Sequence, residues 1–255
     1  MKKASGKFIT FEGIEGCGKS TQTRLLADYL SGRGLKVLVT REPGGTGLGE
    51  AIRKLLLDPA NSGRIDARAE LLLYLASRQQ LLAEVIIPAR AAGKIVLCDR
   101  YEDATLAYQG AGRGLGMEKI RRVIRSLPLQ VKPDLTLLFD LEPEEGFRRI
   151  KKAKKILDRF EREKLDFHRK VRAGYLRIAR AEKKRVKLVD ASLPVKKVQE
   201  QVIRIVGKAL SSNLPHRVSQ PVSQHLVEAA GRIVAPPDFH RTMGKIVQGR
   251  RLIKI

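Results

Sequence analysis

A glycine-rich octapeptide near the N-terminus carries the most specific chemical signal in the chain. Residues 13–20 read Gly-Ile-Glu-Gly-Cys-Gly-Lys-Ser, directly after the apolar run Phe8–Phe11 and directly before a helical pattern. In that setting glycines let backbone N–H groups point at phosphate oxygens, and the helix N-terminus adds positive potential. Lys19 would reach the β and γ phosphates, and Ser20 would bind Mg²⁺. A glycine-rich turn that merely joins a strand to a helix fits less well, because pattern and context agree. The sequence therefore predicts binding of a nucleoside triphosphate by Gly13, Ile14, Glu15, Gly16, Cys17, Gly18, Lys19, Ser20 and Thr21.

Two further polar motifs follow later apolar runs. Arg41 to Thr46 reads Arg-Glu-Pro-Gly-Gly-Thr, a turn whose arginine and glutamate could steer a phosphorylated substrate or hold the loop together. Asp99-Arg100-Tyr101 offers a carboxylate that could act on Mg²⁺ or its waters, and an arginine that can bind phosphate bidentately. Alone, an Asp-Arg pair is weak evidence, since helix caps and surface ion pairs also contain it.

These motifs must be positioned by a sheet, and the apolar pattern predicts one. Five short, nearly continuous apolar runs are typical of strands covered on both faces: Phe8–Phe11, Val37–Val39, Ile95–Cys98, Leu135–Phe139 and Val186–Val189. Between them lie long helical patterns at 67–92, 161–184 and 194–210. This order predicts an α/β fold with a five-stranded parallel sheet between two helical layers. Binding sites of such folds lie at the C-terminal ends of the strands, where the motifs also lie.

Composition narrows the class of protein. The chain has 255 residues, of which 43% are hydrophobic, enough for one α/β domain with an appendage. Cys17 and Cys98 form no plausible disulfide framework, which favours a reducing compartment. No apolar stretch has the length of a signal sequence or a membrane span. We therefore expect a soluble cytoplasmic protein.

The formal net charge of +24 raises the question of nucleic acid binding. Residues 143–185 alone carry 17 Lys and Arg against 7 Asp and Glu. A basic helical segment near a phosphate loop suits a polyphosphate clamp at least as well as a polymer, and part of the charge is ordinary solvated helix surface. Nucleic acid is therefore not the expected partner.

Taken together, the motifs are similar to those of the thymidylate kinase family of nucleoside monophosphate kinases. The matching segments are G-I-E-G-C-G-K-S-T-Q, R-E-P-G-G-T, L-Y-L-A-S-R, D-R-Y, A-Y-Q-G-A-G-R-G and L-D-R-F-E, in the family's order and spacing. The resemblance covers Lys7 to about Leu210. It implies a P-loop NTPase fold with a helical lid, and transfer of the γ-phosphoryl group of ATP to thymidine monophosphate with Mg²⁺. It also implies a homodimer.

The resemblance assigns roles on the acceptor side. Arg100 would bind the monophosphate and Arg78 the thymine edge, while Tyr74 would stack on the base. Thr105 would hydrogen-bond the base, and the Tyr108 ring would leave no room for a 2′-hydroxyl. The full implied substrate site is Glu42, Tyr74, Arg78, Arg100, Thr105, Tyr108 and Gln109. Ala104 stands where relatives commonly have serine, and Gln109 or a water could compensate.

The resemblance also divides the catalytic charges. Gly16 occupies the position where one class of the family has a P-loop arginine, so this chain resembles the class in which the lid supplies the cation. The expected lid spans about 148–162, where Lys151, Lys152, Lys154 and Lys155 replace the usual arginines. Lysine has the charge without the planar fork. The candidate catalytic residues are Glu15, Lys19, Asp99, Arg100, Arg149, Lys152 and Arg159, with Ser20 and Asp99 as Mg²⁺ ligands, directly or through water.

Three functions stay in competition on the sequence alone. A thymidylate kinase explains every motif. A kinase for another pyrimidine nucleoside monophosphate, or a deoxynucleoside, would share most of them. A nucleic-acid-associated NTPase would explain the charge and predicts steeply salt-dependent DNA affinity. Residues 211–255 lie beyond the resemblance as a basic extension of unassigned role, and their three histidines, His216, His225 and His240, lack metal-ligand spacing.

Overall fold

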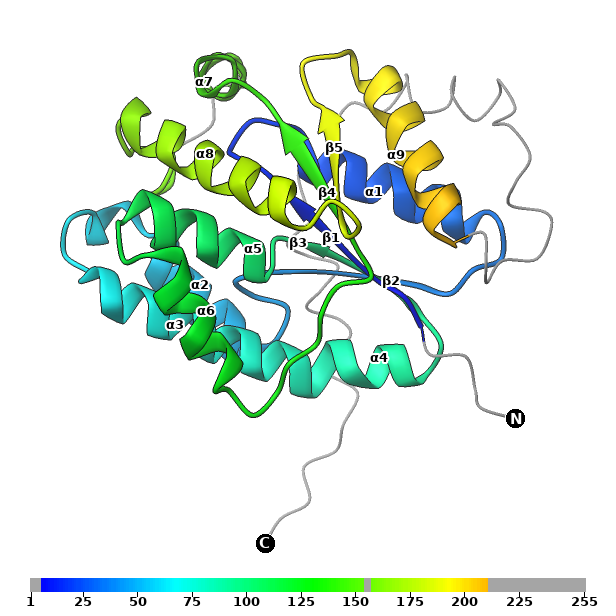
Figure 1. Cartoon of the computed structure of the whole chain (residues 1–255), viewed down its shortest axis with the longest axis horizontal. Helices are drawn as coiled ribbons and strands as arrows, with labels where there is room; N and C mark the ends of the chain where they lie inside the picture. Colours follow the sequence, from blue (N-terminus) through cyan, green and yellow to red (C-terminus); the bar gives the residue numbers. More distant parts are fainter. Residues whose placement is uncertain (1–5, 154–156, 211–255) are drawn as a thin grey trace, which may run out of the picture. The chain divides into compact units, whose positions relative to one another are not determined.

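The structure, a computed structural model, describes residues 6–153 and 157–210. Within them, five strands form one parallel sheet in the order β2-β3-β1-β4-β5 (Figure 1). The strands are β1 (Phe8–Glu12), β2 (Val37–Arg41), β3 (Ile95–Asp99), β4 (Leu135–Asp140) and β5 (Val186–Asp190). The predicted α/β fold with a five-stranded parallel sheet is confirmed.

Each strand continues one or two residues beyond its predicted apolar run and ends on a charged residue. The ladder persists there, with Arg41 paired to Asp99, and the Arg100 N–H donates to the Phe11 carbonyl at 3.0 Å. The sequence pattern identifies a strand only by its apolar side chains. The backbone hydrogen bonds of the sheet continue past them, because they do not depend on side-chain polarity. As a result, Glu12, Arg41 and Asp99 come together at the C-terminal edge of the sheet.

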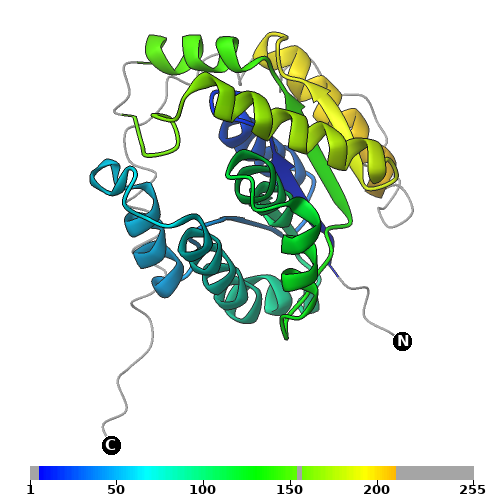
Figure 2. The ribbon, with the colours of Figure 1, turned by 60° about the vertical axis from the view of Figure 1, so that its left-hand side comes forward.

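Helices cover both faces of the sheet (Figure 2). On one face α1 (Lys19–Ser31) packs against α9 (Val195–Leu210). The other face carries α3 (Ala67–Leu81), α5 (Glu102–Thr105) and α8 (Leu165–Ala181). Two π-helical segments, η2 (Leu82–Ile86) and η3 (Leu106–Gly112), extend α3 and α5. Helix α4 (Ile87–Ala91) follows η2. It contains Pro88, which has no N–H to donate to the preceding turn. The remaining helices are α2 (Gly47–Leu57), which packs on α3, the 3₁₀ turn η1 (Pro59–Asn61), α6 (Met117–Arg125) and α7 (Pro143–Lys152).

The central strand β1 sends alternate side chains to the two helical layers. Phe8 packs with Leu81 and Ile86, and Glu12 accepts a hydrogen bond from Tyr175 of α8. Phe11 instead stacks on Phe139 of β4, with ring centroids 5.9 Å apart. Every residue of β1 is buried, which makes this strand a rigid support for the loop that follows it.

The expected lid begins in α7, whose last turn holds Arg149 and Lys152. Lys154 and Lys155 lie outside the described residues, as does the extension 211–255. Beyond the gap, residues 159–163 form turns before α8 begins. In the described part of the chain, no helix is long and apolar enough to cross a membrane.

Candidate active site

The loop between β1 and α1 has the geometry of a phosphate cradle. Gly13, Gly16 and Gly18 all adopt positive φ, at 139°, 72° and 85°, which side chains disfavour. The buried Lys19 ammonium lies inside the loop and donates to the carbonyls of Gly13 at 3.0 Å and Ile14 at 2.7 Å. A cation is thus held beside the backbone curl, at the N-terminus of α1.

A hydroxyl and a carboxylate meet next to this loop. Ser20 Oγ donates to Asp99 Oδ2 at 2.7 Å, although the residues are 79 positions apart. Mg²⁺ prefers oxygen ligands, and it is usually bound by one or two protein groups together with waters and phosphates. Ser20 and Asp99 therefore fit such an ion, and no larger cluster of metal-ligating side chains occurs among the described residues.

The loop touches α7 backbone to backbone. A Cβ at Gly16 would lie 2.4 Å from the carbonyl oxygen of Gly146, and a Cβ at Gly146 would lie 2.6 Å from that of Glu15. Neither contact is possible for a real side chain. With α7 in this position a side chain at residue 16 has no space.

A second group of polar residues is built around a buried ion pair. Arg78 donates to Glu42 through Nε at 2.9 Å and through Nη2 at 2.7 Å, and Nη2 also reaches Thr105 Oγ1 at 2.7 Å. Burial alone would lower the pKa of Arg78, but the Glu42 carboxylate raises it well above its ordinary value. Among the described residues, the buried Nη1 of Arg78 has no hydrogen-bond acceptor. Such an orphan donor is costly unless a ligand satisfies it.

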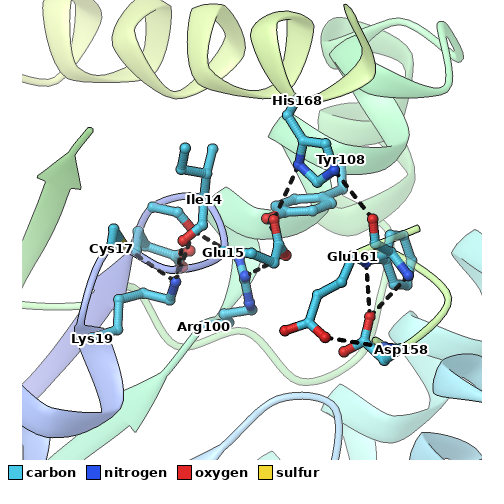
Figure 3. A network of polar contacts seen from close by, with 12 residues as sticks. Ile14, Glu15, Cys17, Lys19, Arg100, Tyr108, Asp158, Glu161 and His168 are labelled. Atoms are coloured by element: carbon cyan, nitrogen blue, oxygen red, sulfur yellow. Dashed lines mark hydrogen bonds and ion pairs between the residues drawn. The ribbon is translucent and has the colours of Figure 1, made fainter. Parts of the chain in front are cut away.

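Arg100 follows β3 beside the glycine-rich loop, in a strained backbone conformation. Its φ is +67°, and no other described non-glycine residue has a positive φ. Nη2 pairs with Glu15 Oε1 at 2.7 Å, Nη1 donates to the Gly13 carbonyl at 2.9 Å, and the guanidinium lies 4.8 Å from the Tyr108 ring centroid (Figure 3). Burial would raise the pKa of Glu15, but Arg100 and His168 hold it well below its usual range.

The strained turn is fixed by a residue that sequence reasoning missed. Glu12 accepts from the Tyr101 N–H at 2.7 Å and from the Tyr175 hydroxyl at 2.8 Å, and Tyr175 also contacts Arg100 at 3.2 Å. Burial, with Asp103 nearby, raises the pKa of Glu12 to about 8, although Arg100 and the two hydrogen bonds oppose this. The partners are 89 and 163 positions away, so no local signal could have identified them.

Aromatic rings line the space between these groups. Tyr108 contacts the edges of Phe160, Phe167 and Tyr175, with centroids 5.7 to 6.2 Å apart, and its hydroxyl donates to Glu15 at 2.6 Å. Tyr74 lies 6.3 Å from Phe160. Phe160 follows the L-D-R motif and was not among the predicted site residues. Together the rings form an apolar wall suited to a base and a sugar.

The three lid candidates are placed differently. Arg149 pairs with Glu145 at 2.8 Å and donates to the Ala191 carbonyl at 2.9 Å, while Lys152 is exposed. Arg159 is 2% exposed and donates to the Leu56 carbonyl at 2.6 Å and to Glu70 at 2.5 Å. The buried Glu70 also binds Gln109, at 2.8 Å. Gln109 therefore binds Glu70, and its amide nitrogen is not available to replace the hydrogen bond that a serine at position 104 would make.

Sequence reasoning missed two further polar residues near this site, Arg53 and His168. Arg41 forms an ion pair with Glu50 at 2.9 Å and so stabilises its own loop. Arg53 of α2 instead donates to the carbonyl oxygen of Pro43 at 3.0 Å. Burial and the charge of Arg41 lower the pKa of Arg53, and two guanidinium groups in proximity favour a bound anion. His168, buried against Glu15, is the second missed residue.

The fold and these residues are typical of a class, the P-loop nucleotide kinases, because a glycine-rich loop after β1 is contacted by a second cation, Arg100. Residues 11–202 match the family model described as Thymidylate kinase, and the chain belongs to the thymidylate kinase family. It is 46% identical to a thymidylate kinase of Thermoanaerobacter sp. (strain X514), over 80% of this chain and 99% of the relative. It is 49% identical to one of Desulforapulum autotrophicum, over 81% and 93%. The crystal structure of thymidylate kinase from Ehrlichia chaffeensis matches with a TM-score of 0.63 and 35% identity, over 79% of this chain and 98% of that one.

Proposed function

We propose that this protein transfers the γ-phosphoryl group of ATP to thymidine monophosphate, giving ADP and thymidine diphosphate. An oxygen of the acceptor phosphate attacks the γ-phosphorus, and the bond between that phosphorus and the β,γ-bridging oxygen breaks. The observation that carries the proposal is the buried Nη1 of Arg78, which lacks an acceptor among the described residues and lies beside Thr105 and the Glu42 pair. A base with a carbonyl edge supplies the missing acceptor.

On the donor side, the loop amides of residues 13–21 bind the triphosphate. Lys19 moves from the loop carbonyls to the β and γ phosphates, because a phosphate oxygen attracts the ammonium more strongly than a neutral carbonyl does. Ser20 and Asp99 would hold Mg²⁺, directly or through water, and the ion would supply neutralisation of phosphate charge.

On the acceptor side, Arg100 binds the monophosphate, supported by Glu15 and Tyr108. Arg78 and Thr105 read the base, Tyr74 stacks on it, and Glu42 and Gln109 hold the neighbouring side chains. Placement of the Tyr108 ring beneath the sugar excludes a 2′-hydroxyl.

The remaining cation comes from the lid. Gly16 and Gly146 leave no room for it in the P-loop. Because Arg159 is already bound by Glu70, its part is to anchor the lid. Arg149 and Lys152, on the last turn of α7, are the candidates for contact with the transferring group.

A coupled ADP-release assay with Mg-ATP tests the reaction against a panel of thymidylate, deoxyuridylate, uridylate, deoxycytidylate and deoxyadenylate. We expect thymidylate to give the highest kcat/KM. Turnover that is absent with thymidylate, or higher with uridylate, would refute the proposal.

We also propose that the protein acts as a homodimer in the cytoplasm. Leu48 and Leu55 of α2 and Leu72 of α3 are 51%, 47% and 62% exposed, and these two helices pack on each other at the edge of the sheet. Exposed leucines on adjacent helices favour a second copy as partner. Light scattering should give twice the chain mass, and Leu72→Glu should halve it.

A further inference from the structure

A buried histidine contacts the P-loop and both ends of the expected lid. His168 lies in the first turn of α8 and is 2% exposed. Its Nδ1 is 3.2 Å from Glu15 Oε2, and its Nε2 is 3.1 Å from the carbonyl oxygen of Phe160 (Figure 3). The roles assigned above to the phosphate-binding and base-binding residues do not use it.

The carboxylate of Glu15 divides its two oxygens between different partners. Oε1 accepts from Arg100 at 2.7 Å and from the Tyr108 hydroxyl at 2.6 Å. Oε2 lies 3.2 Å from His168 Nδ1, and it has no hydrogen-bond partner in the described part of the chain. His168 therefore faces the oxygen that Arg100 and Tyr108 do not engage, on the carboxylate that contacts both of these residues.

The other ring nitrogen ties down the segment after the lid. A carboxylate and a carbonyl oxygen are both acceptors, and each faces one nitrogen of the ring. The Phe160 carbonyl belongs to a turn that Asp158 caps by accepting from the Phe160 and Glu161 N–H groups at 2.9 Å. Next to it, Arg159 is anchored on Glu70.

His168 also touches the near end of the lid. The Phe147 ring of α7 meets the imidazole edge-on, with centroids 4.9 Å apart at 90°. Phe147 directly follows Gly146, which contacts the P-loop backbone. One side chain thus contacts α7, the turn at Phe160 and the loop that holds both substrates' phosphates.

We propose that His168 is a positioning residue for phosphoryl transfer, which couples the placement of the lid to the orientation of Glu15 and through it of Arg100 and Tyr108. This inference rests on the proposed kinase function. Phosphoryl transfer requires two anions in line, and displacements near 1 Å cost about 10²-fold in rate. A residue that holds α7 and the turn at Phe160 against the P-loop sets this alignment without touching a substrate.

Two substitutions separate the two contacts. His168→Asn places an amide nitrogen near the position of Nδ1 and retains the contact with Glu15, but it is too short for the Phe160 carbonyl. His168→Gln reaches the position of Nε2 and retains the Phe160 contact, but it removes the nitrogen that faces Glu15 Oε2. We expect His168→Asn to lower kcat about 10-fold with the KM for thymidylate within about twofold. His168→Gln should raise that KM about 10-fold with a smaller change in kcat.

The control is Ile178→Val, which loosens packing of the same helix away from the site, at a residue 1% exposed. Thermal midpoints of all variants show whether kinetic changes follow stability. Opposite splits of kcat and KM in the Asn and Gln variants support the inference. Equal losses that track the midpoint as in Ile178→Val, or wild-type kinetics in both, overturn it. Absence of thymidylate turnover in the wild-type chain would instead refute the proposed function.

Discussion

The acceptor side and the lid side of the site differ in how their charges are held. Arg78 and Glu42 are 2% and 3% exposed and joined by several hydrogen bonds, whereas Arg148 of the lid helix is 78% exposed and pairs within its own helix. Buried charges must be paired, and the pairing fixes the geometry of both side chains. Exposed charges lose little free energy when they change position. The Arg78–Glu42 pair is therefore preorganised, while an exposed cation of α7 such as Arg148 can change position at little cost.

The largest effect on the rate is expected at Lys19, in the phosphate-binding loop. Lys19→Ala should lower kcat by about 10³-fold, because the cation nearest the β and γ phosphates is lost. Steady-state kinetics with thermal midpoints measure this, with the exposed Lys54→Ala of α2 as the control that should stay at wild-type rate. A loss under about tenfold would mean that the lid compensates and that the division of roles is wrong.

Preorganisation of the acceptor pocket is tested by its ion pair. Arg78→Met should raise the KM for thymidylate about 10²-fold by removing two charged hydrogen bonds. It should also cost about 3 to 5 kcal/mol in the free energy of unfolding, because Glu42 is left buried without its cation. Adding Glu42→Gln should restore most of the stability and leave the KM high. If KM recovers together with stability in urea titrations, Arg78 has a structural role alone.

The buried side should respond to pH through Glu12, whose folded pKa of about 8 exceeds its ordinary value of 4.5. Between these values the folded chain retains a proton that the unfolded chain releases, so stability is full below pH 4.5 and is lost as pH rises toward 8. The free energy of unfolding of the wild type should therefore fall relative to Glu12→Gln, by up to about 1.4 kcal/mol per pH unit. Parallel curves from urea denaturation across this range would contradict the raised pKa.

The same contrast explains what could be predicted from sequence. The strands, the P-loop and the order of motifs are local signals, because apolar runs and glycine spacing act within a few residues. The partners of Glu12, Arg159 and His168 are set by packing between distant elements. Arg159 was expected near the transferred phosphoryl group from its motif, yet Glu70, 89 positions away, binds it. The sequence shows only that residue 16 is a glycine. The close approach of Gly16 to the Gly146 backbone gives a physical reason why no larger residue stands there.

Ionic strength gives the smallest effect and separates the two sides most directly. Exposed charges are screened by salt, whereas buried pairs are screened much less. Raising salt from about 0.05 to 0.5 M should therefore raise the KM for ATP by about two- to threefold through the exposed lid, at Lys152 among others. The KM for thymidylate should change less, because Arg78 is buried, and Lys152→Ala should reduce the salt response for ATP. Equal salt dependence for both substrates would mean that acceptor binding is limited by exposed cations, and that the buried pair does not govern it.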